Sequence, residues 1–154
     1  MINYLIGDAT YPSIKEDSKG IIAHIVNDQG GWGRGFVLAL SQRWPELRRR
    51  YKLWSQTQEF VLGNINSTWV EPNIYVVDML AQKGYYNRIT NPVPLDYEAL
   101  RSCLIKLNDL SITLNSSIHV PKIGSCLAGG NWNTIEELIL RYLGERDVFI
   151  YSLQ

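Results

Sequence analysis

The run Ile21-Ile22-Ala23-His24-Ile25-Val26-Asn27 leads into glycines at positions 30, 31, 33 and 35, and Phe36-Val37-Leu38-Ala39-Leu40 follows them. The first run is apolar on both faces except for His24, which is typical of a strand that is covered on both sides. The second apolar run opens a helical pattern. A buried strand that passes through a glycine loop into a helix predicts an α/β fold.

The rest of the sequence repeats this alternation. Apolar runs predict further strands at 2–6, 60–63, 74–77, 118–123 and 148–151, with a polar Asn/Ser/Thr stretch between the second and the third of them. Helices are predicted from Phe36, from Pro45, after Asp96 as N-cap and, with Asn133 and Glu136 as a capping box, up to Gly144. We therefore expect one domain over residues 1–154, with a sheet that is largely parallel in its centre and helices on both faces.

Composition narrows the class of protein. A length of 154 residues fits one domain. Fifteen Lys and Arg balance fifteen Asp and Glu, and this zero net charge argues against a protein that holds a polyanion through a positive surface. Two cysteines without a CxxC spacing predict neither a disulfide framework nor a zinc site. The start does not resemble a signal peptide and no apolar run reaches about 18 residues, so we expect a soluble, cytoplasmic protein without a membrane partner.

The glycines are unevenly placed. Seven of the twelve lie in two loops, 30–35 and 124–130, and each loop runs from an apolar strand into a helix. Because glycine lets the backbone approach a ligand and a helix start attracts an anion, the loops predict a site for a diphosphate or two separate phosphates. The alternative is that both loops are merely tight turns. A GxGxxG fingerprint and a GxxxxGK[ST] motif are both missing, which counts against a nicotinamide-dependent oxidoreductase and an ATPase.

Four segments form a set that covers essentially the whole chain. They are Ile6-Gly7-Asp8, Ala23-His24-Ile25-Val26-Asn27 with Gly31-Trp32-Gly33-Arg34-Gly35-Phe36, Pro121-Lys122-Ile123-Gly124-Ser125-Cys126-Leu127-Ala128-Gly129-Gly130-Asn131-Trp132, and Val148-Phe149-Ile150-Tyr151. Together they resemble the macrodomain, the ADP-ribose-binding module, and His24 ahead of a Gly-Trp-Gly loop is most similar to its ADP-ribose 1''-phosphate phosphatase branch. The resemblance implies a three-layer α/β/α sandwich around a mixed, largely parallel sheet, ADP-ribose as ligand, and no metal or other cofactor.

The resemblance also assigns ligand contacts residue by residue. Asp8, between Gly7 and Ala9, stands where macrodomains bind the adenine amino group, and Tyr151 stands where an aromatic ring lies beside adenine. Asn27 matches a residue that contacts the distal ribose. The two loops would line the diphosphate and the distal ribose with Gly31, Trp32, Gly33, Gly35, Phe36, Ile123, Gly124, Ser125, Cys126, Leu127, Ala128, Gly129 and Gly130. By residue type alone, Asp8 and Asn27 are turn residues and Tyr151 is a packing residue.

The main catalytic candidate is His24. In the phosphatase branch its counterpart lies near the distal ribose, and an imidazole can act as a general acid, a general base or a nucleophile. By residue type alone, a histidine in an apolar strand is more often part of the core. Lys83 lies near the place of a lysine that attacks the ribose in deacylating relatives. Asp78, at the end of its predicted strand, is a candidate replacement for the acid that is absent at Ala128. His119 matches no role and is expected to be structural.

Three functions remain open. The first is hydrolysis of an ADP-ribose derivative, either the 1''-phosphate or ADP-ribose attached to a protein or nucleic acid. The second, favoured by Ala128, is a reader that binds ADP-ribose without chemistry. The third, an ordinary nucleotide-binding oxidoreductase, requires a nicotinamide cofactor.

Overall fold

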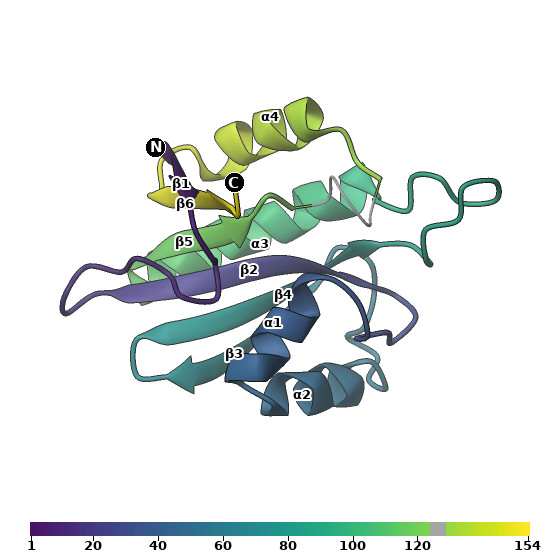
Figure 1. Cartoon of the computed structure of the whole chain (residues 1–154), viewed down its shortest axis with the longest axis horizontal. Coiled ribbons are helices and arrows are strands. Elements are labelled where there is room, and N and C mark those ends of the chain that lie inside the picture. Colours follow the sequence, from purple (N-terminus) through teal and green to yellow (C-terminus); the bar gives the residue numbers. More distant parts are fainter. Residues whose placement is uncertain (124–128) are drawn as a thin grey trace.

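The computed structural model describes residues 1–123 and 129–154, and these residues contain one six-stranded sheet and four helices (Figure 1). In chain order the elements are β1 (Ile2–Ile6), β2 (Lys19–Asn27), α1 (Phe36–Arg43), α2 (Glu46–Trp54), β3 (Ile65–Glu71), β4 (Ile74–Gln82), α3 (Tyr97–Leu114), β5 (Ser116–Pro121), α4 (Trp132–Leu143) and β6 (Val148–Ser152). The α/β alternation predicted from the sequence is therefore confirmed.

The sheet is mixed and largely parallel. Its strand order is β1-β6-β5-β2-β4-β3, and every neighbouring pair runs parallel except β3 with β4. The carboxyl ends of five strands therefore meet at one edge of the sheet, which is where ligands bind in open α/β folds.

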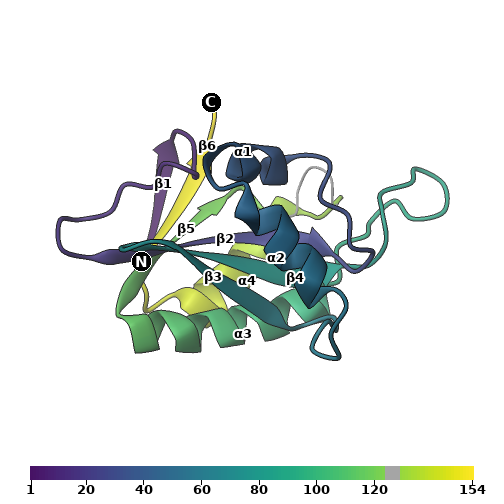
Figure 2. The same ribbon diagram turned by 90° about the horizontal axis from the view of Figure 1, so that it is seen from below.

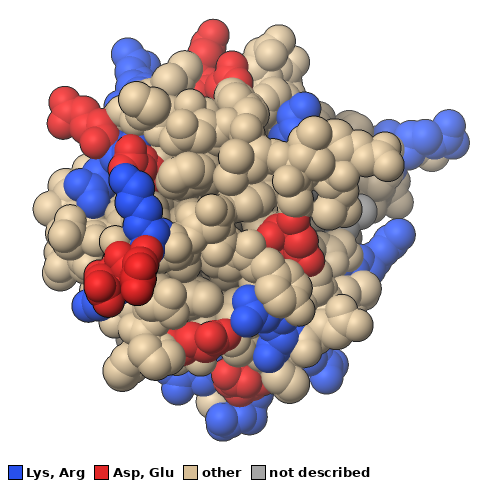
Figure 3. All heavy atoms as spheres, turned by 60° about the vertical axis from the view of Figure 1, so that its left-hand side comes forward, with Lys and Arg blue, Asp and Glu red and all other residues tan. Residues whose placement is uncertain are grey.

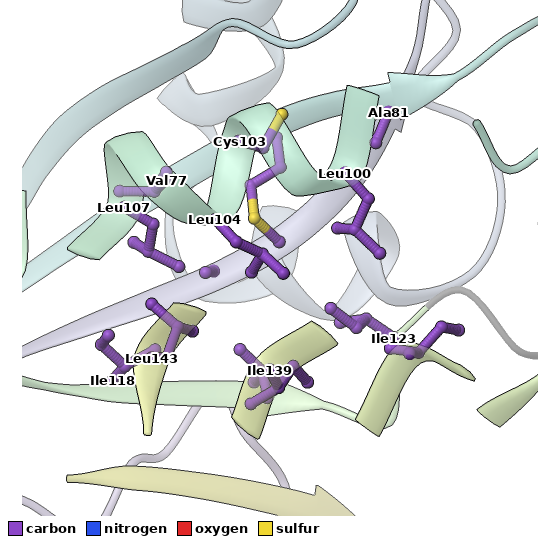
Figure 4. Packing of buried hydrophobic residues seen from close by; sticks show 14 of the residues in the cluster. Val77, Ala81, Leu100, Cys103, Leu104, Leu107, Ile118, Ile123, Ile139 and Leu143 are labelled. Atoms are coloured by element: carbon purple, nitrogen blue, oxygen red, sulfur yellow. The ribbon is translucent and has the colours of Figure 1, made fainter. Parts of the chain in front are cut away.

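Two hydrophobic cores lie on opposite faces of the sheet and make it the middle of three layers (Figure 2). On one face, α3 and α4 contribute fully buried residues such as Leu104, Leu107 and Ile139, whose side chains meet those of the strands (Figure 4). On the other face, α1 and α2 bury Leu40 and Tyr51. The three-layer α/β/α sandwich is thus confirmed.

Helix boundaries follow the predicted signals closely, with one exception. Asp96 caps α3, and its carboxylate accepts a hydrogen bond of 3.0 Å from the Ala99 amide. The capping box predicted at Asn133 and Glu136 is wrong, because α4 already begins at Trp132. Its cap is Asn131, whose Oδ1 accepts a 3.3 Å hydrogen bond from the Thr134 amide.

The strand predicted at 60–63 is wrong. The following polar stretch forms β3 instead, while Phe60 packs against the rings of Tyr51 and Trp54 at centroid distances of 5.9 and 5.1 Å. Gly63 turns the chain with φ near +98°, a conformation that a strand does not adopt. Strand β3 lies at the edge of the sheet and pairs with β4 alone, so most of its side chains remain partly or fully exposed and need not be apolar.

The core on the α3 face offers a test of the packing. We expect Leu107→Ala to lower the free energy of unfolding by about 2–5 kcal/mol, because the leucine is fully buried and its loss leaves a cavity. Ile112→Ala, on the exposed side of the same helix, should cost less than about 1 kcal/mol. Urea denaturation of both variants measures the difference, and equal losses would contradict this placement of α3.

Candidate functional site

A cleft of about 650 Å³ lies at the carboxyl edge of the parallel strands. Such a volume suits a small-molecule ligand. The cleft is lined by Gly7, Asp8, Ala9, His24, Ile25, Val26, Asn27, Gly31, Gly33, Arg34, Gly35, Phe36, Val37, Ala39, Gln82, Tyr85, Tyr86, Pro121, Lys122, Ile123, Tyr151 and Leu153. These residues come from the ends of β1, β2, β4, β5 and β6 and from the start of α1, so the parallel topology assembles the cleft.

Helix α2 holds the glycine loop after β2 from behind. The Tyr51 hydroxyl donates to the Asn27 carbonyl at 2.6 Å, and the Lys52 ammonium donates to the Gly30 carbonyl. The Asn27 side chain closes the loop on itself, since its Oδ1 accepts from the amides of Gln29 and Gly31 at 2.9 and 3.1 Å. Burial raises the pKa of Tyr51 above its ordinary range, so this hydroxyl stays protonated as a donor.

The start of α1 opens into the cleft. Its cap is Gly35, at φ 78°, which has no side chain to bond the first amides of the helix, and the first turn holds no acidic residue. The Leu38 amide donates to the Gly35 carbonyl at 3.1 Å, while no side chain caps the two amides before it, so these amides and the positive end of the helix dipole favour an anion here.

A second polar group lies at the end of β1. Asp8 Oδ1 accepts hydrogen bonds from the Thr10 amide and hydroxyl at 2.9 and 2.8 Å. The Arg43 guanidinium, which lies between the rings of Tyr11 and Trp44, donates to the Thr10 carbonyl and to Glu71. The turn that carries Asp8 is thus tied to α1 and to β3.

His24 and Asp78 form a buried pair beside the cleft. They face each other in the register of β2 and β4, and His24 Nε2 lies 2.6 Å from Asp78 Oδ1, with both residues 2% exposed. Among the described residues, His24 Nδ1 has no hydrogen-bond partner. The rings of Trp32 and Phe36 pack against the imidazole at 5.5 and 5.8 Å.

His119 lies behind Tyr151, at the end of the cleft that carries Asp8. Its Nδ1 is 2.8 Å from the Tyr151 hydroxyl and its Nε2 is 2.7 Å from Ser117 Oγ. Burial lowers the pKa of His119 to about 4, so the imidazole is neutral near neutral pH. The described residues contain no group of three His, Cys, Asp or Glu side chains that could hold a metal ion.

Comparison with known proteins identifies the family. No protein-family model matches the chain. A macrodomain protein from Streptomyces coelicolor shares 38% sequence identity with it, covers 99% of both chains and superposes with a TM-score of 0.85. The chain is a macrodomain.

Two curated relatives extend this comparison. Chromodomain-helicase-DNA-binding protein 1-like from Danio rerio is 31% identical over 96% of the macrodomain, which spans only 15% of that protein's length. A protein named ADP-ribose 1''-phosphate phosphatase from Candida albicans is 24% identical over 92% of the macrodomain and 94% of its own length.

The cleft brings together most of the predicted residues that the structure describes, while their roles stay predictions. Gly7, Asp8, Ala9, His24, Asn27, Gly31, Gly33, Gly35, Phe36, Ile123 and Tyr151 line it. Gly124, Ser125, Cys126, Leu127 and Ala128 lie outside the described residues, and Gly129 and Gly130 are not among those lining the cleft.

Three predicted residues of the macrodomain lie elsewhere. Trp32 is buried behind the cleft, where its indole donates to Ser41 Oγ at 2.7 Å. Lys83 is exposed and does not line the cleft. Asp78 lies within β4 rather than at its end, and it borders the site only through His24, because β4 continues to Gln82.

The part of the cleft wall that follows β4 was not predicted from the sequence. Gln82, Tyr85 and Tyr86 line the cleft there. A Cβ on Gly31 would clash with the Tyr85 hydroxyl, so the glycine lets this tyrosine approach the loop after β2. Their position in the sequence could have indicated them, because Tyr85 and Tyr86 follow a central parallel strand. Segments that follow such strands line the edge of the sheet where ligands bind.

The buried His119 predicts an acid-sensitive fold. Burial lowers the pKa of His119 from 6.5 in the unfolded chain to about 4 in the folded chain. Between pH 6.5 and 4 the unfolded chain therefore binds a proton at this histidine and the folded chain does not. This histidine should therefore lower the free energy of unfolding, with no effect above pH 6.5 and a loss of up to about 3 kcal/mol once the pH reaches 4. Urea titrations of the wild type and of His119→Phe between pH 7 and 4 measure the difference, and parallel profiles would contradict it.

Proposed function

We propose that this macrodomain binds ADP-ribose in the cleft. The observation that carries the proposal is the uncapped start of α1, which faces a cleft that also contains Asp8 and Tyr151. Amides at a helix start bind a diphosphate without a basic side chain, which suits a protein of zero net charge. On the surface in Figure 3, acidic and basic side chains are likewise interspersed.

The two ends of the ligand then have different surroundings. Thr10 bonds Oδ1 of Asp8, and we propose that Oδ2 accepts the adenine amino group while the Tyr151 ring lies beside the base. The distal ribose would reach the loop that Asn27 closes, near Gln82 and Tyr85. A ligand in this orientation places its C1'' end on the side of the cleft where His24 lies.

Asp8→Asn tests the adenine assignment. The asparagine keeps one oxygen for Thr10 and replaces the acceptor for the amino group by a donor, so ADP-ribose affinity should fall about tenfold. The analogue with hypoxanthine in place of adenine carries an acceptor where adenine has its amino group. The substitution should therefore reduce the affinity for this analogue less than the affinity for ADP-ribose. Calorimetric titration of both ligands measures this.

Asp17→Asn provides a matched control, because Asp17 is an exposed loop aspartate outside the cleft and the substitution removes the same charge. It should leave both affinities unchanged. No binding of ADP-ribose by the wild type would contradict the proposed function as a whole.

We further propose that the macrodomain hydrolyses an ADP-ribose derivative, with His24 as the acid–base group. The 24% identity to a protein named ADP-ribose 1''-phosphate phosphatase supports this activity. His24 borders the cleft, and its Nδ1, which has no hydrogen-bond partner within residues 1–123 and 129–154, is the nitrogen left to accept a proton while Asp78 bonds Nε2. For the 1''-phosphate, water would attack phosphorus, the bond from phosphorus to the ribose oxygen would break, and one proton would pass to the leaving oxygen.

A reader of ADP-ribose is the second candidate function. Three observations favour it: His24 is 2% exposed, Lys83 lies outside the cleft, and Ala128 replaces the acid of the deacylating relatives. In this case the same cleft would bind the ADP-ribose of a modified protein or nucleic acid without releasing it.

A turnover assay separates the two. The substrates are ADP-ribose 1''-phosphate, a glutamate-linked and a thymidine-linked ADP-ribose. If the protein is a hydrolase, His24→Gln should reduce turnover at least about 100-fold, because glutamine can still bond Asp78 but cannot carry the proton. Its affinity for ADP-ribose should stay within about threefold. Full turnover by this variant would contradict the role of His24, and a wild type that binds ADP-ribose but turns over none of the substrates would identify a reader.

A further inference from the structure

A chain of hydrogen bonds runs from the wall of the cleft into the sheet. The Ser13 amide donates to the Tyr151 hydroxyl at 2.9 Å, and that hydroxyl lies 2.8 Å from His119 Nδ1. On the far side of the ring, His119 Nε2 lies 2.7 Å from Ser117 Oγ, which donates to the Lys19 carbonyl at 3.4 Å. The chain thus joins the segment after β1, the last strand, β5 and β2.

Two observations determine the direction of the protons. A carbonyl can only accept, so Ser117 donates its one proton to Lys19 and accepts from His119 Nε2–H. Burial lowers the pKa of His119 to about 4, so near neutral pH the imidazole is neutral and its Nδ1 carries no second proton. Nδ1 therefore accepts from the Tyr151 hydroxyl, whose oxygen accepts from the Ser13 amide.

Packing holds the same groups in place. The His119 ring stacks on Phe149 with centroids 5.0 Å apart and an angle of 6° between the planes. The Tyr151 ring lies against Gly7, where a Cβ would come within 3.8 Å of its Cδ2. Tyr151 itself is 5% exposed.

We propose that His119 is a positioning residue of the adenine end: it holds the Tyr151 hydroxyl, and so fixes both the ring beside the base and the Ser13 segment that follows Asp8. The inference rests on the proposed ADP-ribose site. Because the hydroxyl donates to His119 and accepts from Ser13, the ligand meets the ring of Tyr151 rather than a polar group. Tyr151 then selects for a flat base, and Asp8 selects for an amino group on it.

The test compares His119→Phe, Tyr151→Phe and the double variant. Phenylalanine at position 119 keeps a ring on Phe149 but removes the acceptor for Tyr151. We expect His119→Phe to weaken ADP-ribose binding about tenfold and to leave ribose 5-diphosphate, which lacks the base, within about twofold. If His119 acts through Tyr151, the double variant should bind ADP-ribose no more weakly than Tyr151→Phe alone.

Phe149→Leu is the packing control, because it removes the stack on His119 but no hydrogen bond of the chain. It should lower stability without weakening ADP-ribose binding. An unchanged ADP-ribose affinity in His119→Phe, or an equal loss for both ligands, would overturn the inference while the wild type still binds ADP-ribose. Absence of binding by the wild type would instead contradict the proposed function.

A second measurement does not depend on whether the variants fold. Two-dimensional ¹⁵N NMR of the wild-type imidazoles at pH 7 reports which nitrogen carries the proton, and the chain has only two histidines to assign. We expect His119 to be protonated on Nε2 and unprotonated on Nδ1. A proton on Nδ1 would reverse the hydrogen bond between His119 and Tyr151 and overturn the inference.

Discussion

Strand β2 pairs with β4 on one side and with β5 on the other, and this double pairing supports both the fold and the site. Its side chains alternate between the two cores, with Ile21 and Ala23 on the α3 face and Ile22 and Val26 on the α2 face. Such a strand can only lie in the middle of a covered sheet. Its parallel partners then end at the same edge, so the loop after β2 and the ends of β4, β5 and β6 surround one cleft.

The sequence was most informative where burial on both faces or a cap determines the local structure. The apolar run 21–26 and the N-cap Asp96 predicted β2 and the start of α3 correctly. The apolar run 60–63 misled because Phe60 fills a gap beside α2 instead of pairing with a strand, whereas edge strand β3 needs few apolar residues. Hydrophobic pattern measures burial rather than strand pairing, so it fails at sheet edges.

The resemblance predicted many of the residues that line the cleft. The buried side-chain pairs beside the cleft, His24 with Asp78 and His119 with Tyr151, were not predicted. His24 and Asp78 are 54 residues apart, and only the parallel register of β2 and β4 places their side chains together. His119 was expected to be structural, and the structure shows it bonded to Tyr151 at the wall of the cleft. The titratable residues can be identified from the sequence, whereas the burial and the hydrogen-bond partners that set the protonation state of a buried histidine come from the fold.

Zero net charge does not exclude an anion in the cleft, because charge can be placed locally: the start of α1 opens into the cleft, and Arg34 and Lys122 are part of its wall. The N-cap of α1 is Gly35, whose φ of 78° is a conformation that L residues rarely adopt. A serine or aspartate there would be strained, so the backbone conformation itself keeps a capping side chain out of this position and leaves the start of the helix open. Tyr51 and Lys52 of α2 donate to the carbonyls of Asn27 and Gly30, which holds the loop that leads into α1. An anion bound at the start of α1 would therefore add the stabilisation that a capping side chain supplies to other helices.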